Sequence, residues 1–258
     1  MKIFNNTKIP KNFKGSALAI GNFDGVHVGH KKVFQQTKKI AKKNKIKFGV
    51  LTFTPLPVMF FNKKIKNYRL TSEDQKLKLF KKSKVDFTIN IKFNKKFSVI
   101  SAEDFIKKII YKKLNPELLA VSNNFKFGKN RKGDVNLLEK FSNKYDYHLL
   151  NIKPFKHSKK IVSSTKIRKY LKRGHVNLAN KLLSRTWYIE GLVKKGKKIG
   201  RKLGYRTCNI NVKNYILPRP GIYAVKVLID NKKYIYGGVA YLGASPTFRR
   251  KEIFLETY

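Results

Sequence analysis

The sequence has one cysteine and no long hydrophobic run, and each of these absences excludes a class of protein. Cys208 alone can form neither an intrachain disulfide nor a cysteine-based zinc site, so a disulfide-rich secreted domain is excluded. Residues 1–14 are interrupted by Asn, Lys and Pro and do not resemble the apolar core of a signal peptide. No stretch approaches the roughly 18 apolar residues that span a membrane. We therefore expect a soluble cytoplasmic protein that has no membrane partner.

Acidic residues are also scarce. The chain has 14 Asp and Glu against 60 Lys and Arg, which gives a formal net charge of +46 over 258 residues. Such a charge attracts nucleic acid through the release of counterions. The lysines are spread through every stretch rather than gathered in one tail, and no aromatic and basic RNA-binding motif is visible. This even spread favours a compositional origin, with Asn, Ile, Phe and Tyr also frequent, over a specific nucleic-acid partner.

Apolar side chains are abundant enough for a folded core, since 41% of the residues are hydrophobic and 19 are Phe. Up to about residue 183, short apolar runs alternate with stretches of helical spacing, which is typical of a parallel sheet flanked by helices. The expected strands cover residues 16–20, 47–53, 85–91, 118–121 and 147–152, and the expected helices begin at residues 27, 71, 101 and 164. We predict a Rossmann-like α/β domain over residues 1–183.

The pattern changes after this point, and only short strands follow. They are expected at residues 187–193, 207–212, 222–229, 233–241 and 253–258, with a hairpin turn at Asp230-Asn231. Several short strands with turns between them indicate an all-β, barrel-like domain. We predict that this second domain covers residues 184–258.

A glycine-bearing loop joins the first expected strand to the first expected helix. Residues 21–30 read Gly-Asn-Phe-Asp-Gly-Val-His-Val-Gly-His. The start of a helix offers free N–H groups to phosphate, and the imidazoles of His27 and His30 can donate hydrogen bonds to a polyphosphate. The alternative is two surface histidines near a turn. Because the chain has only five histidines, this spacing directly after a strand favours a phosphate site.

A second polar cluster begins the helix after the last strand of the same domain. Residues 163–168 read Ser-Ser-Thr-Lys-Ile-Arg. Hydroxyl groups and helix N–H groups can hold phosphate oxygens, and Arg168 can neutralise the charge of a leaving group. Read alone, Ser-Ser-Thr is simply a good helix N-cap. Together with the two histidines it predicts a site for nucleotide phosphates.

These segments resemble those of a known family. Residues 27–30 resemble the HxGH signature of nucleotidyltransferases, and residues 163–168 resemble their ISSTxIR signature. Residues 21–30 as a whole are similar to the longer form of this motif in bacterial bifunctional riboflavin kinase/FMN adenylyltransferases, which are also called FAD synthetases. Asn-Phe-Lys-Phe-Gly at 124–128, followed by Gly133-Asp134, resembles the family's NFxFG loop near the flavin and adenine. Ser122 departs from the Gly that is common there.

The resemblance implies that the first domain transfers AMP from ATP to FMN by direct in-line displacement, giving FAD and pyrophosphate, with Mg²⁺ bridging phosphate oxygens. In this reading the catalytic residues of the first domain are His27, His30 and Arg168. The residues implied to contact ATP or FMN are Gly21, Asn22, Phe23, Asp24, Gly25, Gly29, Asn124, Phe125, Phe127, Gly128, Ser163, Ser164 and Thr165.

Residues 196–209 resemble the riboflavin kinase pattern GxxxGRxLGxPTAN, with Arg206 and Cys208 in place of Pro and Ala. A glycine-rich hairpin is the structural alternative. The resemblance implies that Thr207 and Asn209 bind Mg²⁺ and that Glu256 is the base that accepts a proton from the ribityl hydroxyl of riboflavin. The residues implied to bind the kinase nucleotide and flavin are Gly196, Gly200, Arg201, Gly204, Thr207 and Asn209.

The sequence stops two residues after Glu256, whereas members of the family continue with a further strand, a loop and a helix. We therefore expect an incomplete second domain with weak or no kinase activity, beside an intact first domain. The expected partners are nucleotides and flavins. Two other readings stay open: a different HxGH nucleotidyltransferase, which would not be expected to carry the kinase pattern, and a basic RNA-binding protein, which would leave the two histidines and residues 163–168 without a role.

Overall fold

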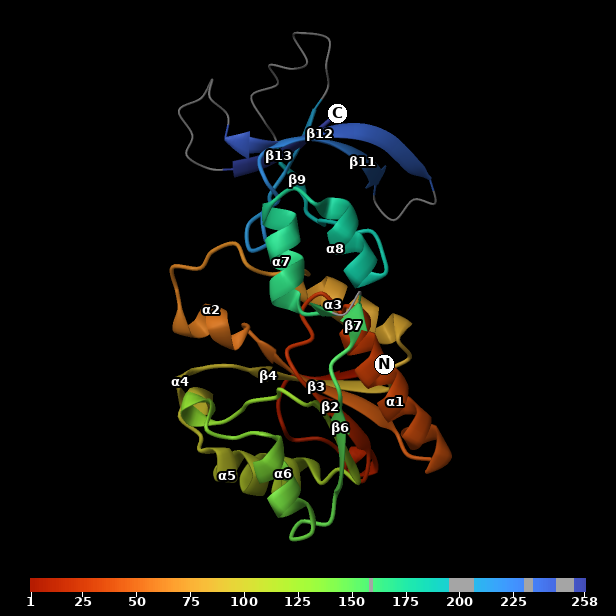
Figure 1. Ribbon diagram of the computed structural model, residues 1–258, viewed down its shortest axis with the longest axis vertical. Helices are drawn as coiled ribbons and strands as arrows, with labels where there is room; N and C mark the ends of the chain where they lie inside the picture. The colour runs from red at the N-terminus through yellow and green to blue at the C-terminus, as the bar shows by residue number, and fades with distance from the viewer. Residues whose placement is uncertain (158–159, 195–206, 230–233, 245–252) are drawn as a thin grey trace. The chain divides into compact units, whose positions relative to one another are not determined.

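The computed structural model describes residues 1–157, 160–194, 207–229, 234–244 and 253–258. The chain divides into two compact units (Figure 1). Unit 1 comprises Met1–Ile65 and Glu73–Ser164, and unit 2 comprises Lys66–Ser72 and Thr165–Tyr258. Each unit contains its own sheet. The domain boundary predicted near residue 184 is a separate division, based on sequence pattern, and stays a prediction.

Unit 1 is built on a six-stranded sheet in which every pair of neighbours is parallel, as the alternation of strands and helices predicts. In spatial order the strands are β1 (Lys2–Phe4), β4 (Phe87–Lys92), β3 (Phe48–Thr54), β2 (Ala17–Ile20), β5 (Leu118–Ser122) and β6 (His148–Ile152). From β2 the chain proceeds outward to β3 and β4 on one side, and then to β5 and β6 on the other. The strand order therefore reverses between β2 and β5, where open α/β sheets bind their ligands.

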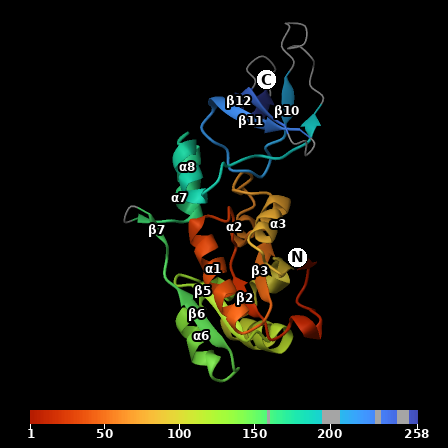
Figure 2. The ribbon, with the colours of Figure 1, turned by 90° about the vertical axis from the view of Figure 1, so that its right-hand side faces the viewer.

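Both faces of this sheet are buried, because successive side chains of a strand point to opposite faces. Leu18 and Ile20 belong to one apolar cluster, and Ala17 and Ala19 belong to another. The first cluster is covered by α5 (Ala102–Asp104), the π-helix η2 (Phe105–Leu114) that continues it, and α6 (Val135–Ser142). The second is covered by α1 (Val28–Lys43) and α3 (Glu73–Lys82). Figure 2 shows helices of unit 1 on both sides of the strands.

Short elements complete unit 1. They are the 3₁₀ turns η1 (Lys11–Phe13) and η3 (Lys129–Arg131), the helices α2 (Pro57–Phe61) and α4 (Lys95–Ser98), and a small hairpin of β7 (Lys156–His157) and β8 (Lys160–Ile161). Of these, α2, α4 and η3 all contribute residues to the pocket described below.

Unit 2 contains two helices, α7 (Ser164–Lys172, from Thr165 onward) and α8 (Val176–Leu183), and an antiparallel sheet. Its described strands, in spatial order, are β11 (Gly221–Leu228), β12 (Ile235–Ala244), β13 (Ile253–Thr257), β10 (Cys208–Ile210) and β9 (Val193–Lys194). An antiparallel β domain after the α/β domain was predicted and is confirmed. The turn predicted at Asp230-Asn231 lies outside the described residues.

The strand predicted over 187–193 is wrong for most of its length, since β9 begins only at Val193. Trp187 explains the difference. Its backbone N–H donates to Asn180 Oδ1 at 2.7 Å, and its indole Nε1–H donates to the Leu70 carbonyl at 2.8 Å. These donors therefore bond to the preceding helix and to residues 66–72 instead of to a neighbouring strand.

The segment Lys66–Ser72 lies between α2 and α3 in the sequence, yet it packs within unit 2. The backbone N–H groups of Tyr68 and Arg69 donate to the Asn214 carbonyl at 3.2 and 2.9 Å, and the Ile216 N–H donates to the Arg69 carbonyl at 2.7 Å. These bonds form a short parallel bridge between Arg69 and Tyr215. The first half of the sequence thus contributes a strand-like segment to the second unit.

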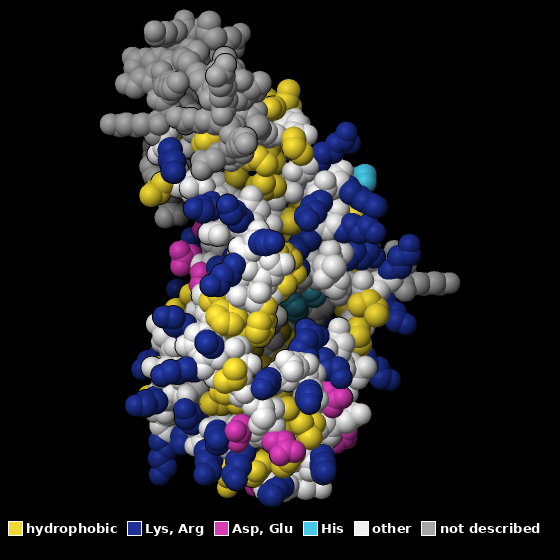
Figure 3. Space-filling view, turned by 90° about the vertical axis from the view of Figure 1, so that its left-hand side faces the viewer, with side chains coloured by type: hydrophobic (Ala, Val, Ile, Leu, Met, Phe, Trp, Pro, Cys, Tyr) yellow, Lys and Arg dark blue, Asp and Glu magenta, His cyan; other side chains and the backbone are white. Residues whose placement is uncertain are grey.

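Lysine and arginine side chains are scattered over the face drawn in Figure 3, and few acidic side chains lie between them. This agrees with their even spread along the sequence. In the described residues, no helix is long and apolar enough to cross a membrane.

Candidate active site

The loop that follows β2 is held from two sides. Thr52 Oγ1, on β3, donates to the Asn22 carbonyl at 3.1 Å, and Ser164 Oγ, at the start of α7, donates to the Asp24 carbonyl at 2.9 Å. Asp24 itself is buried. Phe23 has a φ of 48°, a left-handed conformation that needs such support in a residue other than glycine. The structure therefore brings the two predicted phosphate segments, residues 21–30 and the start of 163–168, into direct contact.

A buried lysine supports the same loop from below. Lys76 Nζ, on α3, donates to Thr52 Oγ1 at 3.2 Å and pairs with Glu73 Oε1 at 3.2 Å. Only 3% of Lys76 is exposed, so its charge is paired inside the protein. The two hydrogen bonds, from Lys76 to Thr52 and from Thr52 to the Asn22 carbonyl, hold the loop in position at the end of the sheet.

His27 and His30 are arranged by the first turn of α1. His27 is the N-cap, and its Nδ1 accepts a hydrogen bond from the His30 backbone N–H at 3.3 Å. The two rings stack, with centroids 3.6 Å apart and planes 20° from parallel. Because Nδ1 of His27 is an acceptor, the neutral ring carries its hydrogen on Nε2. Both imidazoles therefore lie at the positive end of a helix, where phosphate binds.

Gly29 leaves space for this close stacking. A Cβ atom at position 29 would lie 3.1 Å from Cε1 and Nδ1 of the His27 ring, closer than ordinary side-chain contacts. The absence of a side chain at Gly29 therefore leaves room for the imidazole ring of His27.

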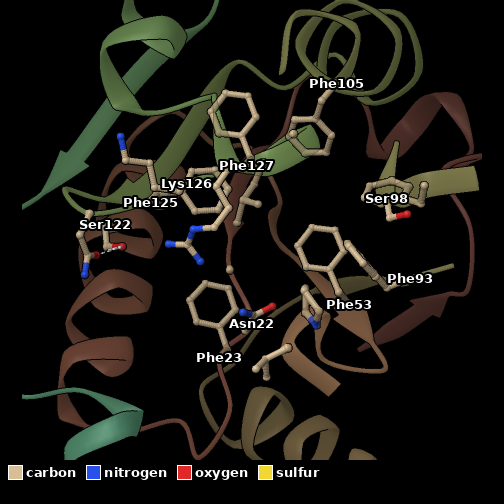
Figure 4. A pocket seen from close by; sticks show the side chains of 18 of the residues that line it. Asn22, Phe23, Phe53, Phe93, Ser98, Phe105, Ser122, Phe125, Lys126 and Phe127 are labelled. Carbon is tan, nitrogen blue, oxygen red and sulfur yellow. Dashed lines mark hydrogen bonds between the residues drawn. The ribbon is translucent and has the colours of Figure 1, made fainter. Parts of the chain in front are cut away.

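A pocket of about 760 Å³ opens where the strand order reverses. This volume lies within the range typical of small-ligand sites, roughly 300–1,000 Å³. Residues that follow the carboxyl ends of β2 and β5 form much of its wall. Figure 4 shows side chains from several elements of unit 1 pointing into it. The lining residues include Asn22, Phe23, His30, Phe53, Phe93, Phe105, Ser122, Asn124, Phe125, Lys126, Phe127, Gly128, Arg131 and Ser164.

The lining is mainly aromatic and its charged side chains are basic. Eight phenylalanines line the cavity: Phe61, Phe97 and those labelled in Figure 4, which are Phe23, Phe53, Phe93, Phe105, Phe125 and Phe127. The charged side chains are those of Lys126 and Arg131, and no Asp or Glu lines the pocket within the described part of the chain. Such a site suits a flat aromatic ring that carries a negative group.

The loop of residues 124–128 forms one wall of this pocket. The rings of Phe125 and Phe127 stack at 5.4 Å between centroids. Gly128 has a φ of 73°, and a Cβ there would lie 2.6 Å from the backbone of Ala102, so only glycine fits. Ser122, the residue that departs from the family pattern, donates from Oγ to Asn124 Oδ1 at 2.9 Å (dashed in Figure 4).

Asp134 has a structural role beside this wall. Its Oδ1 accepts from the Leu137 N–H at 3.1 Å and caps α6, and its Oδ2 pairs with Lys126 Nζ at 3.1 Å. The backbone hydrogen bond from Leu137, followed by the hydrogen bond from Lys126, lowers the pKa of the Asp134 carboxyl below its usual 3.8. The carboxylate therefore holds α6 and the pocket residue Lys126 together.

Arg168 lies on α7 within unit 2 and is buried. Its Nε–H donates to the Tyr68 carbonyl at 2.8 Å, and its guanidinium carbon lies 3.8 Å from the centroid of the Tyr68 ring. Ser163 and Thr165 flank Ser164 at the start of the same helix. Because residues four apart share a face of a helix, Arg168 is on the face that carries Ser164. Its predicted place beside the two histidines stays a prediction.

Part of the predicted kinase site is formed in unit 2. Thr207 Oγ1 donates to Glu256 Oε1 at 2.6 Å, and Asn209 on β10 pairs with Glu256 on β13 in the antiparallel register. The predicted metal ligands and the predicted base thus lie together and present oxygen atoms, the donors that Mg²⁺ prefers. Within the described residues, no cluster of three or more His, Cys, Asp and Glu could hold a metal. Gly196, Gly200, Arg201 and Gly204 lie outside the described residues.

Sequence reasoning missed several residues of these sites. Phe53, Phe93 and Arg131 line the pocket, Lys76 supports the phosphate loop, and Tyr68 contacts Arg168. Phe53 and Phe93 carried a usable signal, because each lies at or just after the carboxyl end of a predicted parallel strand. Tyr68 carried none, since its partner is 100 residues away in the sequence.

Residues 9–166 match the family model described as FAD synthetase, and residues 183–258 match the one described as riboflavin kinase. The chain belongs to the bifunctional riboflavin kinase/FMN adenylyltransferase family. The protein of that name from Buchnera aphidicola subsp. Schizaphis graminum is 42% identical over 248 residues, which are 95% of this chain and 78% of the relative. The one from Escherichia coli strain K12 is 34% identical over 245 residues, covering 95% and 77%.

The fold is also similar to a solved structure. A crystal structure described as a macrolide-efflux protein from Streptococcus pneumoniae superimposes with a TM-score of 0.83 at 26% identity, covering 99% of this chain and 83% of that one. The predicted family, fold class and enzyme class are confirmed: the chain is a nucleotidyltransferase and kinase of FAD and FMN biosynthesis. The match to riboflavin kinase over residues 183–258 argues against a different HxGH nucleotidyltransferase, which would not be expected to carry the kinase pattern.

Proposed function

We propose that unit 1 transfers AMP from ATP to FMN and releases pyrophosphate, and that the β domain uses ATP to phosphorylate riboflavin to FMN. One observation carries the first assignment. His30, one of two stacked histidines at a helix start, lines a cavity walled by phenylalanines at the reversal of strand order. A site for nucleotide phosphates and a site for a flat aromatic ring are therefore joined in one unit.

In this mechanism the isoalloxazine ring of FMN lies among the phenylalanines. Lys126 and Arg131 attract its phosphate toward the histidines, and an oxygen of that phosphate attacks the α-phosphorus of ATP in line with the departing pyrophosphate. No covalent enzyme intermediate forms. Asn22, Asp24 and Asn124 position the nucleotide and the flavin.

The histidines act on charge that develops during the transfer. The Nε2–H of His27 and the ring of His30 donate hydrogen bonds to the triphosphate, and the N–H groups at the start of α1 add to them. The hydroxyls and N–H groups of Ser163, Ser164 and Thr165, with Arg168, hold the pyrophosphate as it leaves. Mg²⁺, when bound to the phosphates, neutralises part of their charge.

In the kinase reaction, Glu256 accepts the proton of the ribityl hydroxyl, and Thr207 and Asn209 offer oxygen ligands for Mg²⁺. The hydrogen bond from Thr207 to Glu256 holds the carboxylate in place beside these ligands. The expectation of a weak kinase stays a prediction, as do the cytoplasmic location and the restriction of partners to nucleotides and flavins.

The test is incubation of the protein with ATP, Mg²⁺ and either FMN or riboflavin, followed by chromatographic separation of the flavins. FAD formed from FMN, with one pyrophosphate released per FAD, supports the transferase assignment. FMN formed from riboflavin supports the kinase assignment. A folded protein that makes no FAD from FMN would overturn the proposal for unit 1.

A further inference from the structure

Tyr68 makes two different contacts with the same arginine. Its carbonyl accepts from Arg168 Nε at 2.8 Å, and its ring lies under the guanidinium group, 3.8 Å from Arg168 Cζ. Only 7% of Arg168 is exposed. A hydrogen bond and a stacked face together fix both the position and the rotation of the guanidinium plane.

Tyr68 itself is held by unit 2. Its N–H and that of Arg69 bond to the Asn214 carbonyl, and the Asn214 N–H donates to Asn67 Oδ1 at 3.2 Å. Two residues further on, Leu70 is fully buried. The backbone that carries Tyr68 is therefore held by hydrogen bonds at Asn67, Tyr68 and Arg69 and by the burial of Leu70.

We propose that Tyr68 is a positioning residue for the use of ATP, which acts by holding Arg168 ready for the pyrophosphate group. This inference rests on the proposed role of Arg168. A free arginine side chain loses much rotational freedom when it binds phosphate, and a side chain that is already held loses less. Tyr68 thus removes a cost of ordering before ATP arrives, without contacting ATP.

The inference predicts which kinetic constants change. A cation stacked on a partly desolvated ring contributes enough to alter an equilibrium about 5- to 30-fold. Tyr68→Leu removes the ring and keeps the backbone carbonyl, so we expect kcat/KM for ATP to fall by about this factor while KM for FMN stays within about twofold. Tyr68→Phe keeps the aromatic face, so it is the matched control and should retain the parent kinetics.

The experiment is a double-mutant cycle of Tyr68→Leu and Arg168→Ala, read by FAD formation at varied ATP and at varied FMN. The expected result is that Tyr68→Leu has little further effect once Arg168 is Ala. Additive losses, or a Tyr68→Leu variant with parent kinetics beside a damaged Arg168→Ala, would overturn the inference. An Arg168→Ala variant with parent kinetics would overturn the proposed role of Arg168 itself, which keeps the two failures distinct.

Circular dichroism and thermal unfolding of every variant separate lost positioning from lost folding. If Tyr68→Leu folds poorly, Tyr68→Met fills more of the same volume without an aromatic face and replaces it in the cycle. A fall in kcat/KM for ATP that is equal in Tyr68→Met and Tyr68→Phe would assign the effect to packing and refute the role of the ring.

Discussion

Replacing Gly29 by Ala should lower activity without lowering stability. The added Cβ would lie 3.1 Å from the Cε1 and Nδ1 atoms of the His27 ring and 3.7 Å from Phe155 Cβ. The ring cannot yield toward His30, because the two imidazoles are already in contact at 3.6 Å between centroids. The His27 ring must therefore shift in another direction by a few tenths of an ångström. We expect this shift to break the hydrogen bond from the His30 N–H to His27 Nδ1, which is already 3.3 Å long.

The size of the effect follows from what this shift does to the donors. Complete loss of one preorganised donor lowers the rate by about 10²–10³, and a misplacement of 1 Å can cost about 10². We expect the smaller shift in Gly29→Ala to lower kcat for FAD formation by about 10- to 100-fold. Meanwhile Ala favours a helix over Gly by about 0.5–1 kcal/mol, which opposes the strain. The Tm should therefore stay within about 4 °C of the parent.

The assay is FAD formation at saturating ATP and FMN, with thermal unfolding measured on the same samples. Gln35→Ala is the control. Gln35 is exposed on the same helix and lies about two helical turns beyond His27. It should leave kcat unchanged. Parent activity in a folded Gly29→Ala protein would refute the idea that the stacked ring must stay where it is.

The remaining predictions concern three side chains. His30→Ala should lower FMN adenylylation by about 10²–10³ with the circular dichroism unchanged, whereas His148→Ala, at the exposed start of β6, should leave it intact; equal activity of the two would contradict the site. Glu256→Gln should lower riboflavin phosphorylation and spare FAD formation from FMN, and a parent kinase rate would remove Glu256 as the base. The pKa of Asp134 is depressed on folding, so its carboxylate stabilises the protein above its usual value of 3.8, and this contribution is lost as the pH falls through the lower folded pKa. The Tm difference between the parent and Asp134→Asn should accordingly be largest near pH 7 and vanish at low pH; a constant difference would refute the charge effect.

Local patterns predicted much of unit 1, because its strands and helices are formed by nearby residues. The run before Gly21 is buried on both faces as a central strand, and the histidines at positions 27 and 30 fall on the first turn of a helix, as their spacing requires. The second unit was less predictable. Residues 187–189 are aromatic and apolar, as expected of a strand, but Trp187 bonds to Asn180 and to Leu70. Leu70 is 117 residues away in the sequence, and no local pattern reveals such a partner.

The candidate site shows the same division. The phosphate loop could be predicted because a single continuous segment carries its chemistry. The part of the pocket wall that could be predicted lies in the recognised motifs, at residues 21–23, 30, 124–128 and 164. Phe53, Phe93 and Arg131 were missed, because different strands and turns bring them to the pocket. The contact between Tyr68 and Arg168 joins parts of the chain that no periodicity relates, so it required the structure.

The path of the segment 66–72 has a practical consequence for dissecting this protein. The chain passes between the two units three times, after Ile65, after Ser72 and after Ser164. A single cut therefore cannot release either unit whole. A fragment that begins at Thr165 would lack the Leu70 carbonyl that accepts the indole N–H of Trp187, and a fragment that ends at Ser164 would carry residues 66–72 without the backbone of Asn214. If a fragment cut between Ser164 and Thr165 is inactive, the loss could thus reflect a disrupted fold as much as the absence of catalytic residues.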